Sequence, residues 1–142
     1  MQVSTLVVGL AIAALQAVPG PMRARLAPVP IDLAMQEAIA GLGAATATLS
    51  GTSLTVEGTY TGLKSPATAV RVYDSPRRGM RGRLVGEFAS GGGTTGAFKG
   101  TVALTREQTT AYVAGLLYVE LNSEKAPDGN LRGWLMAPKG QR

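Results

Sequence analysis

The sequence of 142 residues contains no histidine and no cysteine. Histidine is the usual general base near neutral pH and the commonest metal ligand, so its absence argues against acid–base catalysis and against zinc or copper sites. The absence of cysteine excludes disulfide bonds and thiolate chemistry. The nine acidic residues are scattered singly and are not spaced like the oxygen ligands of a calcium loop. We therefore expect no metal site and no cofactor.

Aromatic residues are also scarce, at 5% of the chain, whereas glycine occurs 19 times. A core made mainly of valine, leucine, alanine and threonine, with many turns, is typical of short β-strands rather than of helices. Serine and threonine are plentiful, yet none has a neighbouring base that could activate a nucleophile. The sequence thus predicts a single folded domain that is not an enzyme and has no catalytic residue.

The first residues form a hydrophobic segment. Val3–Val18 contains no charged residue, and the sequence Pro-Gly-Pro that follows ends the segment sharply. Its sixteen residues would rise about 24 Å as a helix, slightly less than the hydrocarbon core of a bilayer, and residues 1–21 are just long enough to span it. Cleavage after Ala17, as in a secretory signal, is the alternative, but the positive residues that precede such signals are missing. We predict that residues 1–21 form an uncleaved membrane helix.

Three small residues of this segment recur at a spacing of four, namely Gly9, Ala13 and Ala17. Such a face lets helices pack closely in lipid, although glycine and alanine are common in any apolar leader. The orientation is open. Arg23 and Arg25 favour a cytoplasmic C-terminal end of the helix by the positive-inside rule, whereas a signal-like leader favours the opposite. We expect a single-pass membrane protein with its folded domain on the periplasmic or extracytoplasmic side.

Four prolines and two arginines make residues 19–30 resemble an extended, polyproline-like spacer. The next segment is ambiguous, because Asp32 could cap a short helix that ends at Gly41, or the segment could be an edge strand. We predict three parts after the membrane helix: a Pro/Arg linker over 22–31, a β-sandwich over 32–138 and a basic tail over 139–142.

Beyond residue 43 the sequence alternates small or apolar residues with polar ones, which is the pattern of half-buried strands. Thr105 and Gln108 fit a capping box that begins a short helix over 105–116. The fold class is predicted as an all-β, antiparallel Greek-key sandwich with one short helix, preceded by a transmembrane helix. Predicted strands cover residues 44–51, 53–60, 67–75, 83–90, 96–105, 117–123 and 130–136.

Four stretches of this region resemble the chordin-type (CHRD) domain in their order and sequence. They are Gly62-Leu63, Leu104–Gln108 (LTREQ), Ala114–Val119 (AGLLYV) and Pro127–Gly133 (PDGNLRG). The resemblance covers about residues 32–137. It implies an immunoglobulin-like or superoxide-dismutase-like sandwich, usually exported, with binding roles.

The chain also departs from the family pattern. Members of that family typically carry an Ala-His-Ile-His-like motif where this chain has Val70-Arg71-Val72-Tyr73, and a histidine where Asn122 stands. The comparison implies that this domain is a divergent member, which has kept the scaffold and lost any metal site that those histidines could form.

Positive charge is concentrated in one predicted loop. Arg77, Arg78, Arg81 and Arg83 fall within seven residues of a chain whose net charge is +5. Guanidinium groups this close repel one another unless they are solvated or face anions. The loop is therefore either merely solvated or binds an acidic protein surface or lipid headgroups. Nucleic acid is not an expected partner, because no aromatic residues are interleaved with the arginines.

Two other features have a structural and a functional interpretation. The glycine-rich segment 91–96 (GGGTTG) lacks the Gly-Lys-Ser/Thr ending of a phosphate loop and is predicted to be a hairpin turn. Trp134 is interpreted as a plug in the core or at its edge, or as an interface residue. Arg132 is expected to form an ion pair with Asp128 or Glu120.

Two functions are consistent with these features. The first is a non-catalytic accessory subunit of a larger membrane complex, such as a photosynthetic reaction-centre, light-harvesting or respiratory assembly. Its helix would lie in the lipid bilayer and its sandwich would contact neighbouring subunits. The second is a secreted or periplasmic binding module whose leader is removed and which binds an acidic protein or ligand.

Overall fold

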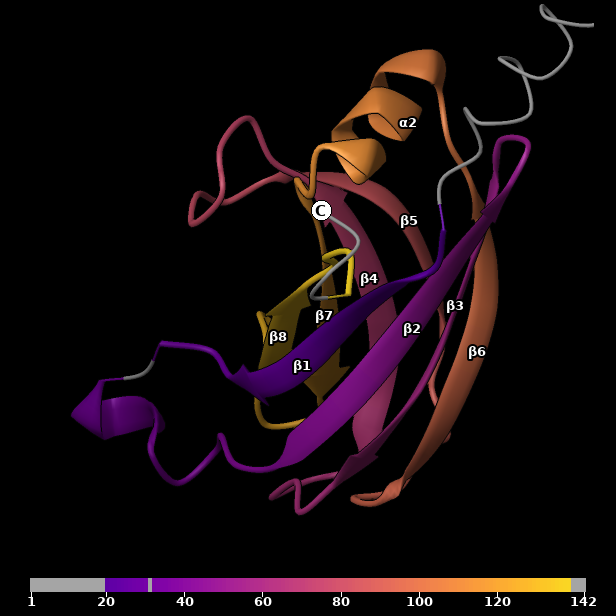
Figure 1. The fold of residues 1–142 in the computed structure, drawn as a ribbon. Helices are drawn as coiled ribbons and strands as arrows, with labels where there is room; N and C mark the ends of the chain where they lie inside the picture. The colour runs from indigo at the N-terminus through magenta and orange to yellow at the C-terminus, as the bar shows by residue number, and fades with distance from the viewer. Residues whose placement is uncertain (1–19, 31, 139–142) are drawn as a thin grey trace, which may run out of the picture.

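A computed structural model describes residues 20–30 and 32–138, which form one antiparallel β-sheet and two short helices (Figure 1). The antiparallel all-β class with one short α-helix, predicted from the sequence, is confirmed. The strands are β1 (Met22–Pro28), β2 (Leu42–Ser50), β3 (Ser53–Thr61), β4 (Ala67–Asp74), β5 (Arg83–Ala89), β6 (Gly96–Ala103), β7 (Leu117–Ser123) and β8 (Leu131–Trp134). The helices are the 3₁₀ turn η1 (Leu33–Met35) and α2 (Arg106–Val113).

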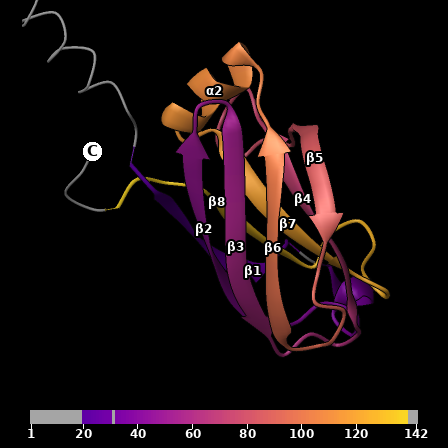
Figure 2. The same ribbon diagram turned by 90° about the vertical axis from the view of Figure 1, so that its right-hand side faces the viewer.

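The sheet curls so that its two halves face each other across the core (Figure 2). The strand order is β5-β4-β7-β8-β1-β2-β3-β6, which places the first and last strands of the chain side by side at its centre. The two outer strands, β5 and β6, meet on the other side, where no backbone ladder joins them within the described residues. Side chains close this seam instead. A Cβ atom at Gly86 would lie 2.5 Å from Val102 Cγ1, and one at Gly100 would lie 2.2 Å from Phe88 Cγ, so both positions need glycine.

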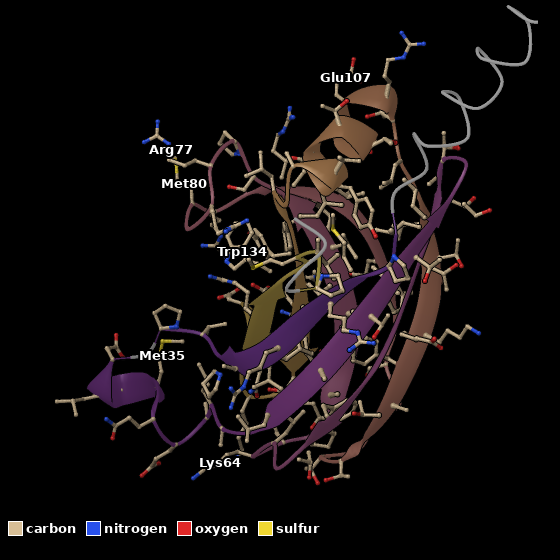
Figure 3. The ribbon with its side chains drawn as sticks, viewed as in Figure 1. Met35, Lys64, Arg77, Met80, Glu107 and Trp134 are labelled. Carbon is tan, nitrogen blue, oxygen red and sulfur yellow. The ribbon has the colours of Figure 1, made fainter. Side chains whose placement is uncertain are left out.

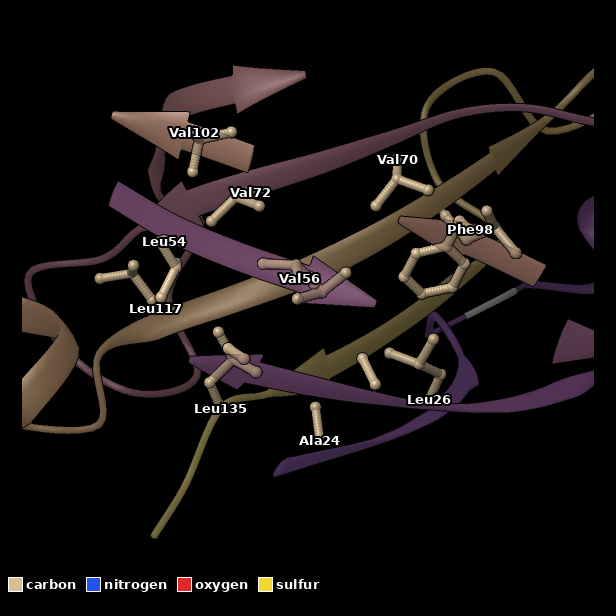
Figure 4. Packing of buried hydrophobic residues seen from close by; sticks show 14 of the residues in the cluster. Ala24, Leu26, Leu54, Val56, Val70, Val72, Phe98, Val102, Leu117 and Leu135 are labelled. Carbon is tan, nitrogen blue, oxygen red and sulfur yellow. The ribbon is translucent and has the colours of Figure 1, made fainter. Parts of the chain in front are cut away.

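The core lies between the two halves of the curled sheet. Alternate residues of each strand point inward, as the two-residue period of an extended chain requires. Figure 4 shows aliphatic side chains of both halves meeting around Val56 and Phe98. Strand β7 differs from the others because all of its residues from Leu117 to Ser123 are buried, on both of its faces. Other residues of the chain must therefore cover the outer side of β7 as well.

Strand β1 occupies most of the segment that the sequence predicted to be a linker, so this prediction is wrong. Met22, Ala24 and Leu26 are 5%, 5% and 0% exposed and belong to the core, while the residues between them face solvent. The strand pairs with β2 along one side and with β8 along the other. The prolines that suggested a spacer stand at its ends, with Pro21 directly before it and Pro28 as its last residue. They leave the interior of the strand free to form ladder hydrogen bonds.

Helix α2 begins at the predicted capping box. Thr105 Oγ1 accepts a hydrogen bond from the Gln108 N–H at 3.2 Å, and Gln108 Oε1 accepts one from the Thr105 N–H at 2.8 Å. The helix covers one end of the curled sheet (Figure 1), which we call the helix end. Tyr112 attaches it there, because its ring is fully buried and its hydroxyl donates to the Ala47 carbonyl of β2 at 3.3 Å.

Tyr112 makes the stability of the domain sensitive to alkaline pH. Burial raises the pKa of its hydroxyl above the ordinary tyrosine value. The unfolded chain therefore releases this proton first, and the contribution of Tyr112 to the free energy of unfolding is lost as the pH rises above about 10. Urea unfolding from neutral to strongly alkaline pH should show a smaller alkaline decrease for Tyr112→Phe than for the wild type. Identical pH profiles for the two proteins would contradict this assignment.

The structure settles two smaller predictions. Asp32 caps a short helix, as one of the two alternatives held, because its carboxylate accepts a hydrogen bond from the Met35 N–H at 3.1 Å, but the helix is a 3₁₀ turn that ends at Met35 and does not reach Gly41. The glycine-rich segment 91–96 is not a hairpin turn, because the strands it joins, β5 and β6, are paired with β4 and β3 instead. Its carbonyl groups bind the β3–β4 connection, where Leu63 N–H donates to Thr94 at 3.1 Å.

The structure does not test the predictions that concern the two ends of the chain. Residues 1–19 of the predicted membrane helix, with Gly9, Ala13 and Ala17, and the predicted basic tail, 139–142, lie outside the described residues. Among residues 20–30 and 32–138, no helix combines the length and the apolar character that crossing a membrane requires.

Candidate binding surface

The arginine loop, residues 75–83, is a hydrogen-bonded turn. The Ser75 hydroxyl lies within hydrogen-bond distance of the carbonyl oxygens of Arg77 and Met80, at 2.6 and 2.9 Å. The Met80 N–H also donates to the Arg77 carbonyl at 3.1 Å. These bonds fix the backbone of the loop, so its arginines project from a defined platform.

The return of this loop to β5 is tied to β7. The Gly82 N–H donates to the Tyr118 hydroxyl at 2.9 Å. A Cβ atom at Gly82 would lie 2.1 Å from the Asp74 carbonyl oxygen, so only glycine fits there. The arginine loop is thereby connected to an aromatic side chain on the outer face of the sheet.

All four arginines of the loop are exposed. Arg83 forms an ion pair with Asp74, with 3.5 Å between Nε and Oδ1, and Arg78 Nη2 donates to the Gly115 carbonyl at 3.4 Å. Within the part of the chain that the structure describes, no carboxylate pairs with Arg77 or Arg81. These two guanidinium groups are available to an external anion.

A cluster of aromatic rings lies beside the loop on the outer side of β4, β7 and β8. The rings of Tyr73 and Tyr118 stack with 5.0 Å between their centroids, and those of Tyr118 and Trp134 lie 4.8 Å apart at 56°. The guanidinium carbon of Arg132 lies 5.3 Å from the Tyr118 centroid, in reach of a cation–π interaction. Tyr118 is buried, whereas Tyr73, Arg132 and Trp134 are partly exposed. We call these four residues the aromatic–arginine face.

Glu120 holds this face in place from beneath. Its side chain is 3% exposed, and its Oε2 accepts hydrogen bonds from Arg132 Nη2 at 2.8 Å and Nε at 3.2 Å. Its Oε1 accepts from Asn122 Nδ2 at 3.2 Å, and the same amide donates to the Pro127 carbonyl at 3.0 Å. The loop after β7 thus folds over the carboxylate, which explains the burial of the outer side of β7. A carboxylate this buried requires such pairing, and the pairing fixes the Arg132 side chain.

The sequence of this fold matches the family model of the CHRD domain over residues 28–135. The chain belongs to the CHRD domain family. The match confirms the resemblance seen in the sequence, and it runs from the last residue of β1 to just beyond β8. No curated protein and no solved structure shows significant similarity to this chain.

The structure brings together the three positions at which the CHRD domain resemblance places histidines. Arg71 and Tyr73 lie opposite Glu120 and Tyr118 in the β4–β7 pairing, and Asn122 lies opposite a neighbouring residue of β4. Arg71 is paired with Glu87 of β5, whose hydrogen bond raises the pKa of the arginine. Within residues 20–30 and 32–138, no group of three His, Cys, Asp or Glu residues could hold a metal ion.

The sequence located only part of this surface. It identified the arginines and Trp134, and it offered Glu120 as one of two ion-pair partners for Arg132, which is the pair observed. It missed the roles of Tyr73 and Tyr118. Alternation in β7 could have placed Tyr118 on the face of Glu120, because residues two apart share a face.

Two shallow hollows lie on the opposite half of this CHRD domain, over β2, β3 and β6. Their walls are mainly alanine, threonine and glycine, and the charged pair Glu57 and Lys99 lies 3.9 Å apart at one edge. The charges of Glu57 and Lys99 offset each other, and Arg25 is the other charged side chain among the lining residues. The aromatic–arginine face and the arginine loop are therefore the better candidates for a functional surface.

Proposed function

We propose that this CHRD domain is a non-catalytic binding domain that contacts a neighbouring protein through its aromatic–arginine face. In this proposal the domain is an accessory subunit of a larger membrane assembly, of the photosynthetic or respiratory kind, and the hydrophobic segment 1–21 tethers it to the bilayer. We further propose that the curled sheet is a Greek-key sandwich related to immunoglobulin or superoxide dismutase domains. The long connections that place β7 beside β4 and β6 beside β3 support that relation.

The composition of the face is the observation that carries the proposal. Tryptophan, tyrosine and arginine are the residues most enriched among those that dominate binding energy at protein interfaces. Here they are held in one arrangement before any partner binds, by ring stacking and by the buried Glu120. A prearranged surface loses little side-chain entropy on association, which favours affinity.

Trp134→Ala tests this proposal. Loss of a central tryptophan from an interface costs about 2 kcal/mol or more, which corresponds to a weakening of roughly 30-fold. We expect the variant chain to recover far less of its partner subunits from solubilised membranes of its source than the wild type does, as measured by quantitative mass spectrometry. Thr48→Ala is the matched control, because Thr48 is exposed on the opposite half of the sheet. Equal recovery by Trp134→Ala and wild type, with both proteins folded, would rule out this face as the interface.

The alternative function is a secreted or periplasmic module that binds an acidic ligand, and the exposed charges of Arg77 and Arg81 favour it. The two functions differ in the fate of the leader. An intact mass that lacks the first 17 residues, measured on the native protein, would favour the secreted module and would contradict the tether.

A further inference from the structure

We propose that the helix end of the domain rests on an anionic lipid surface, with the arginine loop against the phosphates of the headgroups. The inference rests on the proposed membrane tether. It adds which end of the domain faces the bilayer and which lipids that end binds.

The chain enters the fold at the helix end of the domain. The uncharged segment ends at Val18, and β1 begins at Met22, which is buried and paired with Ala47 of β2. The few residues between Val18 and Met22 span about 14 Å at most, even when fully extended. Met22 lies at the helix end, because it pairs with Ala47, whose carbonyl accepts the hydrogen bond from Tyr112 of α2. A tethered domain must therefore keep this end close to the bilayer.

Charge is distributed unevenly between the two ends of the described domain. Between the strands, the helix end carries four arginines, three of them in the arginine loop and the fourth at Arg106, and one carboxylate, Glu107, while Arg83 is paired with Asp74. The connections at the opposite end carry four carboxylates and two lysines. Figure 3 shows Arg77 and Met80 at the first of these ends, and Met35 and Lys64 at the second. An anionic surface therefore attracts the helix end and repels the opposite one.

The side chains around this entry point combine positive charge with exposed apolar groups. Met22, Arg78, Val113 and Gly115 line one shallow hollow, so the base of the arginine loop adjoins the start of β1 and the end of α2. Met80 and Val113 are 49% and 55% exposed, and both are apolar. Arginine binds phosphate oxygens with paired N–H groups, while exposed apolar side chains enter the headgroup boundary. This combination fits a lipid surface better than a purely acidic protein surface.

The test uses the full chain reconstituted into vesicles, one set of phosphatidylcholine alone and one set that also contains phosphatidylglycerol. Because the chain has no cysteine, Met80→Cys and Lys64→Cys each give a single site for a fluorophore, at opposite ends of the domain. Quenching by a headgroup-labelled lipid then reports the distance of each end from the bilayer. We expect strong quenching at position 80, increased by phosphatidylglycerol and weakened by high salt, and little quenching at position 64.

Charge variants of the loop complete the test. Replacing Arg77, Arg78 and Arg81 by serine should lower the ratio of docked to undocked domain by about 100-fold in phosphatidylglycerol vesicles, at roughly fivefold for each arginine near an anionic surface. Replacing the same three by lysine keeps the charge and should retain most of the docking. Circular dichroism confirms that each variant is folded.

The outcomes separate this inference from the function it rests on. If the full chain fails to float with either set of vesicles, the membrane tether is wrong and the inference falls with it. If the chain floats but position 80 is quenched no more than position 64, the tether stands and the lipid contact is wrong. In a third outcome, the arginine loop is protected from solvent in native membranes, but quenching at position 80 does not change with phosphatidylglycerol. Its partner is then an acidic protein, and the inference is again overturned.

Discussion

Replacing Glu120 by alanine is expected to lower the free energy of unfolding by about 3 kcal/mol, because breaking a buried ion pair leaves a charge without its partner. Arg132 would lose both of its hydrogen bonds to the carboxylate, and the Asn122 amide would lose one of its two acceptors. Urea unfolding followed by the fluorescence of Trp134, the only tryptophan, measures the change. A loss below about 1 kcal/mol, the range of an exposed pair, would show that Glu120 does not hold this face.

The double variant Glu120→Leu with Arg132→Leu is the control for this prediction. Replacement of both partners by apolar residues removes the unpaired charge, so the double variant should be more stable than Glu120→Ala. It should nevertheless bind its partner poorly, because Arg132 is part of the aromatic–arginine face. The pair of variants thus separates the contribution of the ion pair to stability from its contribution to binding.

Leu26→Ala is expected to lower the free energy of unfolding by about 3 kcal/mol, because the removal of a fully buried leucine leaves a cavity in the core. Leu26 is 0% exposed and lies in β1, in the segment that the sequence suggested was a spacer. Denaturant unfolding of the variant against the wild type gives the difference directly.

Leu42→Ala supplies the matched comparison, since it makes the same chemical change on the neighbouring strand at a side chain that is 53% exposed. It should change stability by about 0.5 kcal/mol or less. If Leu26→Ala is as mild as Leu42→Ala, then β1 is not part of the core and the spacer interpretation is restored.

Much of the fold was predictable because its signals are local. The alternation of apolar and polar residues that predicted β2 to β8 involves residues only a few positions apart. The same is true of the capping box at Thr105. The alternation of Met22, Ala24 and Leu26 was equally local, but flanking prolines and two arginines gave the segment the composition of a spacer. Its burial depends on β2 and β8, which approach it from both sides. The hydrophobic segment and the basic tail remain sequence-based predictions.

The candidate surface was harder to predict because it is built from distant segments. The arginines of the loop are neighbours in sequence, so their cluster was visible. The stacking of Tyr73 on Tyr118 depends on the register between β4 and β7, which no local pattern encodes. The same holds for Gly82, whose N–H bonds the Tyr118 hydroxyl and so links the loop to the face.

The proposed function requires that a partner covers the aromatic–arginine face in the native assembly. Hydroxyl-radical footprinting tests this directly, because tryptophan, tyrosine and methionine are reactive and Trp134 is unique in the chain. We predict that oxidation of Trp134 is several-fold slower in native membranes than in the purified chain, while Met35, at the opposite end of the domain, reacts equally in both. Equal oxidation of Trp134 in the two samples would show that no partner covers the face and would contradict the proposed function.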